Sequence, residues 1–250
     1  MKEKRILLTA IGSFSARAII KRLKELGFFV FGMDCYPKEW VVNAALVDGF
    51  IQVPLVSKEE DYEEACFSIV ENRGIDAIFP LTDIEVDYFY KNRKKYEEKG
   101  IVLLLPKGDL SLIRNKYLLG RNLSLSMEKG FSVIEGKGYE EMDFSEPEFP
   151  LVAKLKSGRS SEGLHYIHSE DQLGFFLNQV FREQKEDAYF FQKQIQGKIY
   201  TVDLFRGESG VERALVRREE LRTGNGAGTS VRILPNEALE KISLKIMADL

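Results

Sequence analysis

The sequence has little cysteine and no long apolar run, and each of these absences excludes a class of protein. Its 250 residues contain two cysteines, Cys35 and Cys66, which are too few and too far apart for a disulfide framework or a zinc site. Sparse cysteine is usual in a reducing compartment, so we expect a cytoplasmic protein. No apolar stretch approaches the ~20 residues that cross a bilayer, and no apolar signal region follows the first residues. We therefore expect no membrane partner.

An excess of charge of one sign is also missing. The chain carries 36 Lys and Arg against 39 Asp and Glu, a formal net charge of -3. Proteins that bind nucleic acid generally need a basic surface, so we expect no nucleic-acid partner. With 44% hydrophobic and 30% charged residues the composition is that of a globular protein, and the length allows one large or two modest domains.

The first hundred residues alternate between short apolar runs and stretches with helical spacing. The expected strands span residues 6–10, 28–33, 50–54, 77–80 and 101–105. Strands with little polar alternation, separated by helices, predict a parallel sheet that is covered on both faces. The fold class is therefore α/β, with a Rossmann-like domain over residues 1–106 that ends at Pro106-Lys107-Gly108.

Two Ser/Thr-x-x-Glu patterns predict helix starts in this domain. Ser57 with Glu60 and Thr82 with Glu85 each have the spacing of a capping box, the second before a helix that should run to near residue 100. Asp83 and Glu85 are also candidates for acid–base chemistry, but capping is the more economical role for this stretch.

After residue 107 the pattern changes to that of an α+β domain with a mainly antiparallel sheet. The expected strands span residues 151–155, 164–167, 188–195, 198–205 and 213–216. One helix is expected over residues 107–130, a loop over 135–149, a helix opened by Ser169 with Gln172, and a last helix after Pro235. His165 and His168 would point to opposite faces of a strand, so we assign no metal ligand in the chain.

The strongest local signal is a strand lysine, Lys154, followed by a loop of small residues. The loop runs through Ser157, Gly158, Arg159, Ser160, Ser161, Glu162 and Gly163. Small residues let backbone N–H groups approach phosphate oxygens, while Lys154 and Arg159 supply positive charge. The loop joins strand to strand and lacks Gly-Lys-Ser/Thr, so it is not a Walker A loop. A flexible hairpin beside a lysine that reaches solvent is the alternative.

This stretch resembles the ATP-grasp superfamily, in particular the carboxylate–amine ligases similar to carbamoyl phosphate synthase. Further matches, in the same order, are the Pro-x-x-Asp-x-Glu-like residues 79–85, Asn115-Lys116, the adenine hinge 191–197 and the strand 200–203. The resemblance implies a pre-ATP-grasp domain over residues 1–106 and an ATP-grasp domain over 107–250 that is incomplete at its C-terminus.

The resemblance also implies roles for individual residues. Those expected at the nucleotide are Lys116, Lys154, Ser157, Gly158, Arg159, Ser160, Ser161, Gly163, Gln192, Lys193, Gln194 and Ile195. The backbone around Gln194 and Ile195 would pair with the adenine edge. Arg217 and Arg218 would face a carboxylate or acyl phosphate, and a solvated charge run over residues 217–220 is the alternative. Residues 224–230 would form a mobile loop that faces the second substrate, unless they are an ordinary surface loop.

The chain departs from the family pattern at three places. Lys193 stands where the hinge has glutamate, and Ile199 stands where Gly-x-Glu-Tyr has its glutamate. No Glu-x-Asn or Asp-x-Asn occurs, so the expected magnesium ligands would lie beyond Leu250. We therefore expect a truncated or a degenerate form that binds nucleotide weakly and is close to inactive by itself.

The function that the resemblance implies is ATP-dependent ligation. A carboxylate would be activated as an acyl phosphate and attacked by an amine, with ATP and Mg²⁺ as cofactors; neither substrate is identified, and a homodimer stays open. The alternative is a non-catalytic binding or regulatory module with the same fold. An NAD-dependent oxidoreductase is disfavoured, because Gly12-Ser13-Phe14-Ser15 lacks the glycine fingerprint even though Asp34 ends the second strand.

Overall fold

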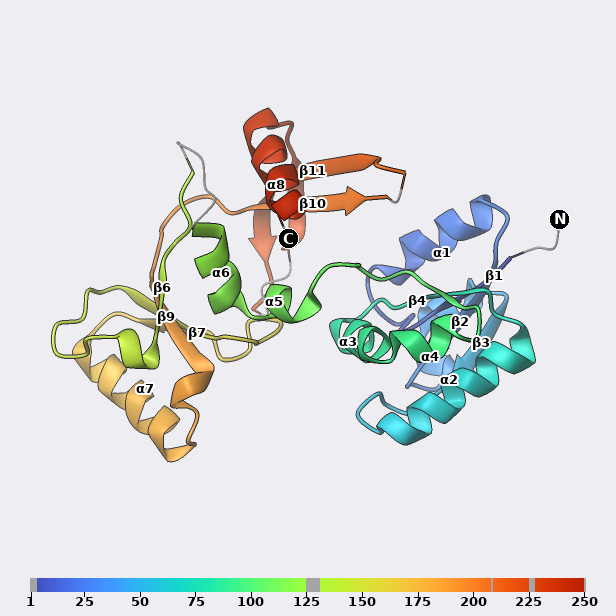
Figure 1. Ribbon diagram of the computed structural model, residues 1–250, viewed down its shortest axis with the longest axis horizontal. Helices are drawn as coiled ribbons and strands as arrows, with labels where there is room; N and C mark the ends of the chain where they lie inside the picture. The colour runs from blue at the N-terminus through green and yellow to red at the C-terminus, as the bar shows by residue number, and fades with distance from the viewer. Residues whose placement is uncertain (1–3, 125–130, 208, 225–227, 250) are drawn as a thin grey trace. The chain divides into compact units, whose positions relative to one another are not determined.

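A computed structural model describes residues 4–124, 131–207, 209–224 and 228–249 of the chain. The chain divides into two compact units, Met1–Leu110 and Ser111–Leu250. The first unit has one sheet and the second has two (Figure 1). The buried apolar clusters of the two units are separate. No helix in the described ranges is both long enough and apolar enough to cross a membrane.

The first unit is built on a five-stranded parallel sheet with the order β3-β2-β1-β4-β5. Its strands are β1 (Arg5–Leu8), β2 (Phe29–Asp34), β3 (Gly49–Gln52), β4 (Ala77–Phe79) and β5 (Val102–Leu103). All four strand pairs are parallel, as the apolar runs predicted, although β5 is shorter than expected. The α/β fold class is therefore confirmed for this part of the chain.

Helices cover both faces of this sheet, because successive strand residues point to opposite sides. The helices are α1 (Ala16–Glu25), α2 (Glu59–Arg73), α3 (Asp83–Lys91) and α4 (Arg93–Glu97), with short turns η1 (Lys38–Trp40) and η2 (Val42–Ala45). Leu7 of β1 packs into a core that holds α2 and α3 side chains such as Tyr62 and Phe89. Its neighbour Leu8 packs into a second core with Ile20 of α1.

The predicted helix caps of the first unit are only partly right. At α2 the capping box is wrong: Lys58 is the N-cap, no side chain caps the helix, and acidic residues in the first turn face the helix dipole instead. Thr82 is the N-cap of α3, but Glu85 does not return to the backbone, because it binds three hydroxyl groups. The long helix expected from Thr82 is wrong as well, since α3 and α4 are separate at Asn92.

The second unit has two antiparallel sheets where the sequence predicted one. The first sheet has the order β6-β9-β7-β8, with β6 (Gly136–Gly138), β7 (Leu151–Leu155), β8 (His165–Ile167) and β9 (Tyr189–Lys193). The second has the order β10-β11-β12, with β10 (Tyr200–Arg206), β11 (Glu212–Arg222) and β12 (Gly228–Ile233). The α+β class is confirmed, but β9 and β10 do not belong to one sheet.

Two strands of this unit lie where loops were expected. β6 falls within the expected loop 135–149, where glycine hides the strand pattern: a Cβ at Gly136 would lie 2.7 Å from Cδ2 of Phe190 on β9. β12 takes up residues 228–230 of the expected loop 224–230, and residues 225–227 of that loop lie outside the described residues.

The helices of the second unit follow local sequence signals. They are α5 (Leu110–Arg114), α6 (Lys116–Ser124), α7 (Glu170–Arg182) and α8 (Glu237–Asp249), with turns η3 (Tyr139–Glu141) and η4 (Glu186–Ala188). The helical assignment of residues 107–130 is confirmed over residues 110–114 and 116–124, but as two helices, because Asn115 separates α5 from α6 and its Oδ1 accepts from Leu118 N at 3.1 Å. Gly130, the expected stop, lies outside the described residues. The Ser169 cap is confirmed, with Oγ accepting from Gln172 N at 3.3 Å.

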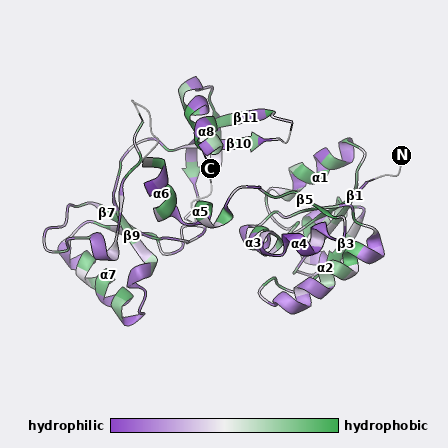
Figure 2. Cartoon of the chain, in the orientation of Figure 1, coloured by the Kyte–Doolittle hydropathy of each residue, from purple (hydrophilic) through white to green (hydrophobic). Residues whose placement is uncertain are grey.

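α7 packs on the first of these sheets through one face only. Figure 2 shows hydrophobic and hydrophilic residues alternating around this helix. The buried residues Leu173, Phe176 and Val180 recur at helical spacing and share a core with Leu151 and Phe191 of the sheet. The opposite face of that sheet carries Lys154 and Gln192, which belong to the candidate site.

Candidate nucleotide-binding site

Lys154 lies on β7, an interior strand of the four-stranded sheet, and is held by a neutral partner. Its Nζ donates to Oε1 of Gln192 on β9 at 2.8 Å. The amide of Gln192 is fixed at its other end, where Nε2 donates to the Ile134 carbonyl at 2.6 Å. Within the described part of the chain no carboxylate pairs with Lys154. The lysine therefore presents a charge that its surroundings do not neutralise.

Lys116 lies near Lys154 but belongs to a different element. It is the first residue of α6; its backbone N donates to the Lys156 carbonyl at 2.7 Å, and its Nζ donates to the Gly158 carbonyl in the loop after β7. Burial lowers the pKa of Lys154, and the charge of Lys116 lowers it further. The two lysines thus converge, and a polyphosphate is the kind of ligand that such a pair of cations can bind.

The loop between β7 and β8 has two consecutive non-glycine residues in the left-handed region of backbone conformation. Ser160 and Ser161 both have positive φ, at 48° and 61°. Such angles are strained for residues other than glycine and cluster at functional sites. The loop closes on itself through Glu162 N to the Arg159 carbonyl at 2.7 Å. Among the described residues, nothing accepts a hydrogen bond from the N–H groups of Ser160 and Ser161, so both can receive an anion.

The loop glycines have a packing role that the sequence did not indicate. A Cβ at Gly158 would lie 2.9 Å from Cβ of Leu155, and one at Gly163 would lie 2.6 Å from Cγ of Leu155. Gly163 also has a φ of 63°. In the structure these glycines let the loop fold back over Leu155, and their expected role in giving phosphate access to the backbone stays a prediction. Ser157 lies at the start of the same loop.

The expected adenine hinge follows β9, and its residues differ in what they offer. Lys193 is exposed, with Nζ 3.8 Å from Oε2 of Glu148, and Ile195 is also exposed. The backbone N of Gln194 donates to the Pro150 carbonyl at 3.0 Å, so that N–H does not serve adenine as expected. In the described structure Oε1 of Gln194 is buried with no hydrogen-bond partner. An amine donor such as that of adenine fits this orphaned acceptor.

Arg217 and Arg218 are adjacent on β11, so their side chains lie on opposite faces of the three-stranded sheet. Arg217 Nε donates to Oδ2 of Asp203 at 2.8 Å, and Arg218 Nε donates to Oε1 of Glu220 at 3.0 Å. The face with Arg218 also carries Arg206, which bonds to the Met247 carbonyl of α8. The two arginines expected at the carboxylate or acyl phosphate are therefore not on one face of the sheet, and of the two only Arg217 lies on the face away from α8.

Glu85 of the first unit is held inside the fold by hydrogen bonds. Oε2 of Glu85 accepts from Thr9 Oγ1 at 2.7 Å and from Thr82 Oγ1 at 2.6 Å, and Oε1 accepts from Tyr62 Oη at 2.9 Å. Burial raises the pKa of Glu85. Sequence reasoning missed this cluster, because its members come from β1, α2 and α3.

Asp34 is likewise used within the fold. Its Oδ2 accepts from Gly12 N at 2.7 Å and its Oδ1 from Tyr36 N at 3.1 Å, which fixes the turn after β1. The Asp34 side chain is 5% exposed, so these contacts explain why an acidic residue ends β2.

The described residues do not form a metal centre. They contain no cluster of three or more His, Cys, Asp or Glu side chains that could hold a metal ion. His165 instead packs against the Phe176 ring, at 4.8 Å between centroids.

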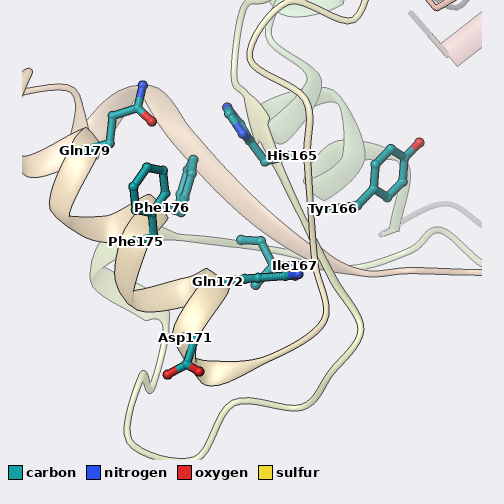
Figure 3. Close-up of a pocket in the computed structure, with 8 residues that line it drawn as sticks. All are labelled: His165, Tyr166, Ile167, Asp171, Gln172, Phe175, Phe176 and Gln179. Carbon is teal, nitrogen blue, oxygen red and sulfur yellow. The ribbon is translucent and has the colours of Figure 1, made fainter.

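A hollow of about 350 Å³ lies between β8 and α7 (Figure 3). Ile167 and Phe176 are its buried apolar residues, and Asp171 is the acidic side chain among those that line it. None of the residues expected at the nucleotide lines this hollow. It is thus separate from the convergence of Lys116 and Lys154.

Several known proteins are similar to this chain in sequence. The family described as PylC-like, N-terminal domain, matches residues 6–104. The carbamoyl phosphate synthase large chain of Clostridium beijerinckii is 26% identical over 241 residues, which cover 92% of this chain and 21% of that protein. D-alanine–D-alanine ligase of Bacillus anthracis is 27% identical over 154 residues, which cover 56% of this chain and 50% of that protein.

A solved structure extends the similarity to the fold of the whole chain. The biotin carboxylase of Campylobacter jejuni, solved as a β,γ-ATP complex, has a TM-score of 0.67 at 16% identity, covering 98% of this chain and 58% of that one. The present chain spans about a fifth of the carbamoyl phosphate synthase chain. The predicted resemblance is confirmed: the chain has the fold of ATP-grasp enzymes, and its sequence is similar to those of their carboxylate–amine ligases.

Proposed function

We propose that this chain, which has the ATP-grasp fold, is the nucleotide-binding part of an ATP-dependent ligase. Residues 1–106 would be the pre-ATP-grasp domain and residues 107–250 the ATP-grasp domain. The parent activity would convert a carboxylate to an acyl phosphate, which an amine then attacks to form a C–N bond. A cytoplasmic location and, for the parent protein, a homodimer belong to the same proposal.

One observation carries the proposal. Lys154 and Lys116 come from separate elements and converge at the loop after β7, where the partner of Lys154 is a neutral amide. A half-buried ammonium without a carboxylate is costly unless a ligand brings negative charge. A triphosphate brings that charge, and the N–H groups of Ser160 and Ser161 offer it further donors.

The other groups have roles that follow from their positions. Oε1 of Gln194 would accept from the adenine amine, and Arg217 would hold the carboxylate or the acyl phosphate with its planar guanidinium. Because the described residues hold no cluster of three metal-ligating side chains and the sequence lacks Glu-x-Asn, we propose that this chain does not supply a complete magnesium site. By itself the chain would then bind nucleotide weakly and turn over little.

ADP formation tests this function. The chain, and any longer polypeptide that its gene encodes, is incubated with ATP and a panel of carboxylates and amines. ADP that forms only when a carboxylate is present, and that Lys154→Ala abolishes, supports the ligase. ADP formation that no carboxylate stimulates argues against it.

A non-catalytic nucleotide-binding module is the second candidate. It is favoured by Lys193, an exposed cation near Glu148 at the hinge where the family has an acid. ATP binding that Lys154→Ala abolishes, without carboxylate-dependent ADP formation by any natural form of the protein, would favour this module.

A further inference from the structure

The helix that carries Lys116 has few apolar contacts of its own. α6 is nine residues long, and every residue from 116 to 123 is exposed or half-buried. A helix this short is marginal in water unless tertiary contacts hold it. Polar contacts from outside the helix must therefore decide how α6 is oriented.

Glu141 supplies these contacts from the turn η3. Its Oε2 accepts from Tyr117 Oη at 2.7 Å and from Gly138 N at 2.7 Å, and its Oε1 accepts from Arg121 Nη1 at 2.6 Å. Arg121 also donates to Tyr117 Oη at 2.6 Å. Tyr117 and Arg121 lie one helical turn apart, so a single carboxylate accepts hydrogen bonds from two residues on one face of α6.

The hydrogen bonds around Glu141 favour its ionised form. The N–H of Gly138 and the hydroxyl of Tyr117, followed by Arg121, lower the pKa of Glu141 to about 2. The carboxylate that holds α6 is thus in its ionised form, which is the stronger hydrogen-bond acceptor.

The Tyr117 ring also contacts the four-stranded sheet. It lies 5.9 Å from the Phe190 ring of β9, and the cations of Arg121 and Lys156 lie 5.5 Å and 5.3 Å from its centroid. The carbonyl of Lys156 accepts from Lys116 N, so the same lysine contacts both residues. Together these contacts fix the rotation of α6 about its axis.

We infer that Glu141, acting through Tyr117, is a positioning residue that sets where Lys116 meets the phosphates. Lys116 is next to Tyr117 in α6, and its Nζ donates to the Gly158 carbonyl. A rotation of α6 would move the Lys116 backbone, and with it the position that Nζ can reach. Glu141 touches no nucleotide in this account. The inference rests on the proposed nucleotide site.

A double-mutant cycle tests whether Glu141 acts through Lys116. ATP is titrated calorimetrically into the wild type, Glu141→Gln and Tyr117→Phe, each with and without Lys116→Ala. The control is Glu140→Gln, which removes the neighbouring carboxylate of the same turn. We expect Glu141→Gln and Tyr117→Phe to weaken ATP binding about tenfold and to add nothing once Lys116 is alanine. Glu140→Gln should leave the affinity unchanged.

The outcomes separate the inference from the function it rests on. Equal weakening by Glu141→Gln in both backgrounds, or no weakening at all, overturns the positioning role while Lys154-dependent binding still stands. ATP binding that is absent from the wild type removes the nucleotide site and the inference with it. Amide hydrogen exchange provides a readout without ATP. Protection in α6 should fall in Glu141→Gln, and unchanged protection would contradict the conclusion that Glu141 holds this helix.

Discussion

Replacing Tyr62 with phenylalanine removes one of the three hydroxyl donors to Glu85 and should destabilise the first unit. Tyr62 is 1% exposed and Glu85 is 7% exposed, so water cannot replace the lost donor. A hydrogen bond to a charged group contributes about 1.5–3 kcal/mol, against about 1 kcal/mol for a neutral pair. We expect Tyr62→Phe to lower the free energy of unfolding by about 2 kcal/mol at a pH above the folded-state pKa of Glu85, where the acceptor is ionised.

The cost of this substitution should depend on pH in a fixed direction. Burial raises the pKa of Glu85 above its ordinary value of 4.5, so the stability that this group contributes is fully present below 4.5 and is lost as the pH rises through the raised pKa. Removing a donor to the anion raises the folded-state pKa further. The loss of stability in Tyr62→Phe should therefore be larger at pH 8 than at pH 4.5.

Urea unfolding followed by the fluorescence of Trp40 measures this effect. Trp40 is the one tryptophan of the sequence and lies in the same unit as Glu85. Tyr96→Phe is the matched control, because the Tyr96 hydroxyl is buried 3.1 Å from the neutral hydroxyl of Tyr88. Its cost should be about 1 kcal/mol at both pH values. A Tyr62→Phe cost that equals the control, or that does not change with pH, would refute the reasoning.

Two further predictions concern the second unit. Gly163→Ala should destabilise the chain by about 1–3 kcal/mol, because a Cβ there meets Leu155 in a backbone with positive φ. Gly197→Ala, where nothing lies within 4 Å, should stay within about 0.5 kcal/mol in the same thermal melts, and equal effects would contradict the packing role. Arg217→Met should weaken the binding of acetyl phosphate, a stable acyl phosphate, by about tenfold in a calorimetric titration, whereas Arg218→Met should not. A loss in Arg218→Met alone would reverse the assignment of faces.

The parallel sheet of the first unit was predictable because its strands are buried on both faces and read as apolar runs. The second unit was harder, because the pairing of strands is a long-range property. Nothing local shows that β9 pairs with β7 while β10 turns to β11. β6 was hidden by Gly136, whose missing side chain makes room for Phe190 but also removes the strand signal.

The candidate site could also be predicted only in part. Residue types and motif order indicated Lys154, Lys116 and the serine loop, because phosphate binding requires small residues and positive charge. The partners that orient them were not predictable: Gln192 meets Lys154 only through strand register, and Glu141 meets Tyr117 across 24 residues that include an expected loop. The opposite faces of Arg217 and Arg218 follow from strand alternation once β11 is known to continue through both residues.

Calorimetric titration of the chain with ATP, with and without magnesium, tests the central claim most directly. The wild type is compared with Lys154→Ala and with Lys185→Ala, which removes a surface lysine that pairs with Glu183. We expect measurable ATP binding that Lys154→Ala weakens by at least about tenfold and that Lys185→Ala leaves unchanged. Wild-type binding that persists undiminished in Lys154→Ala, or no binding by the wild type under either condition, would contradict it.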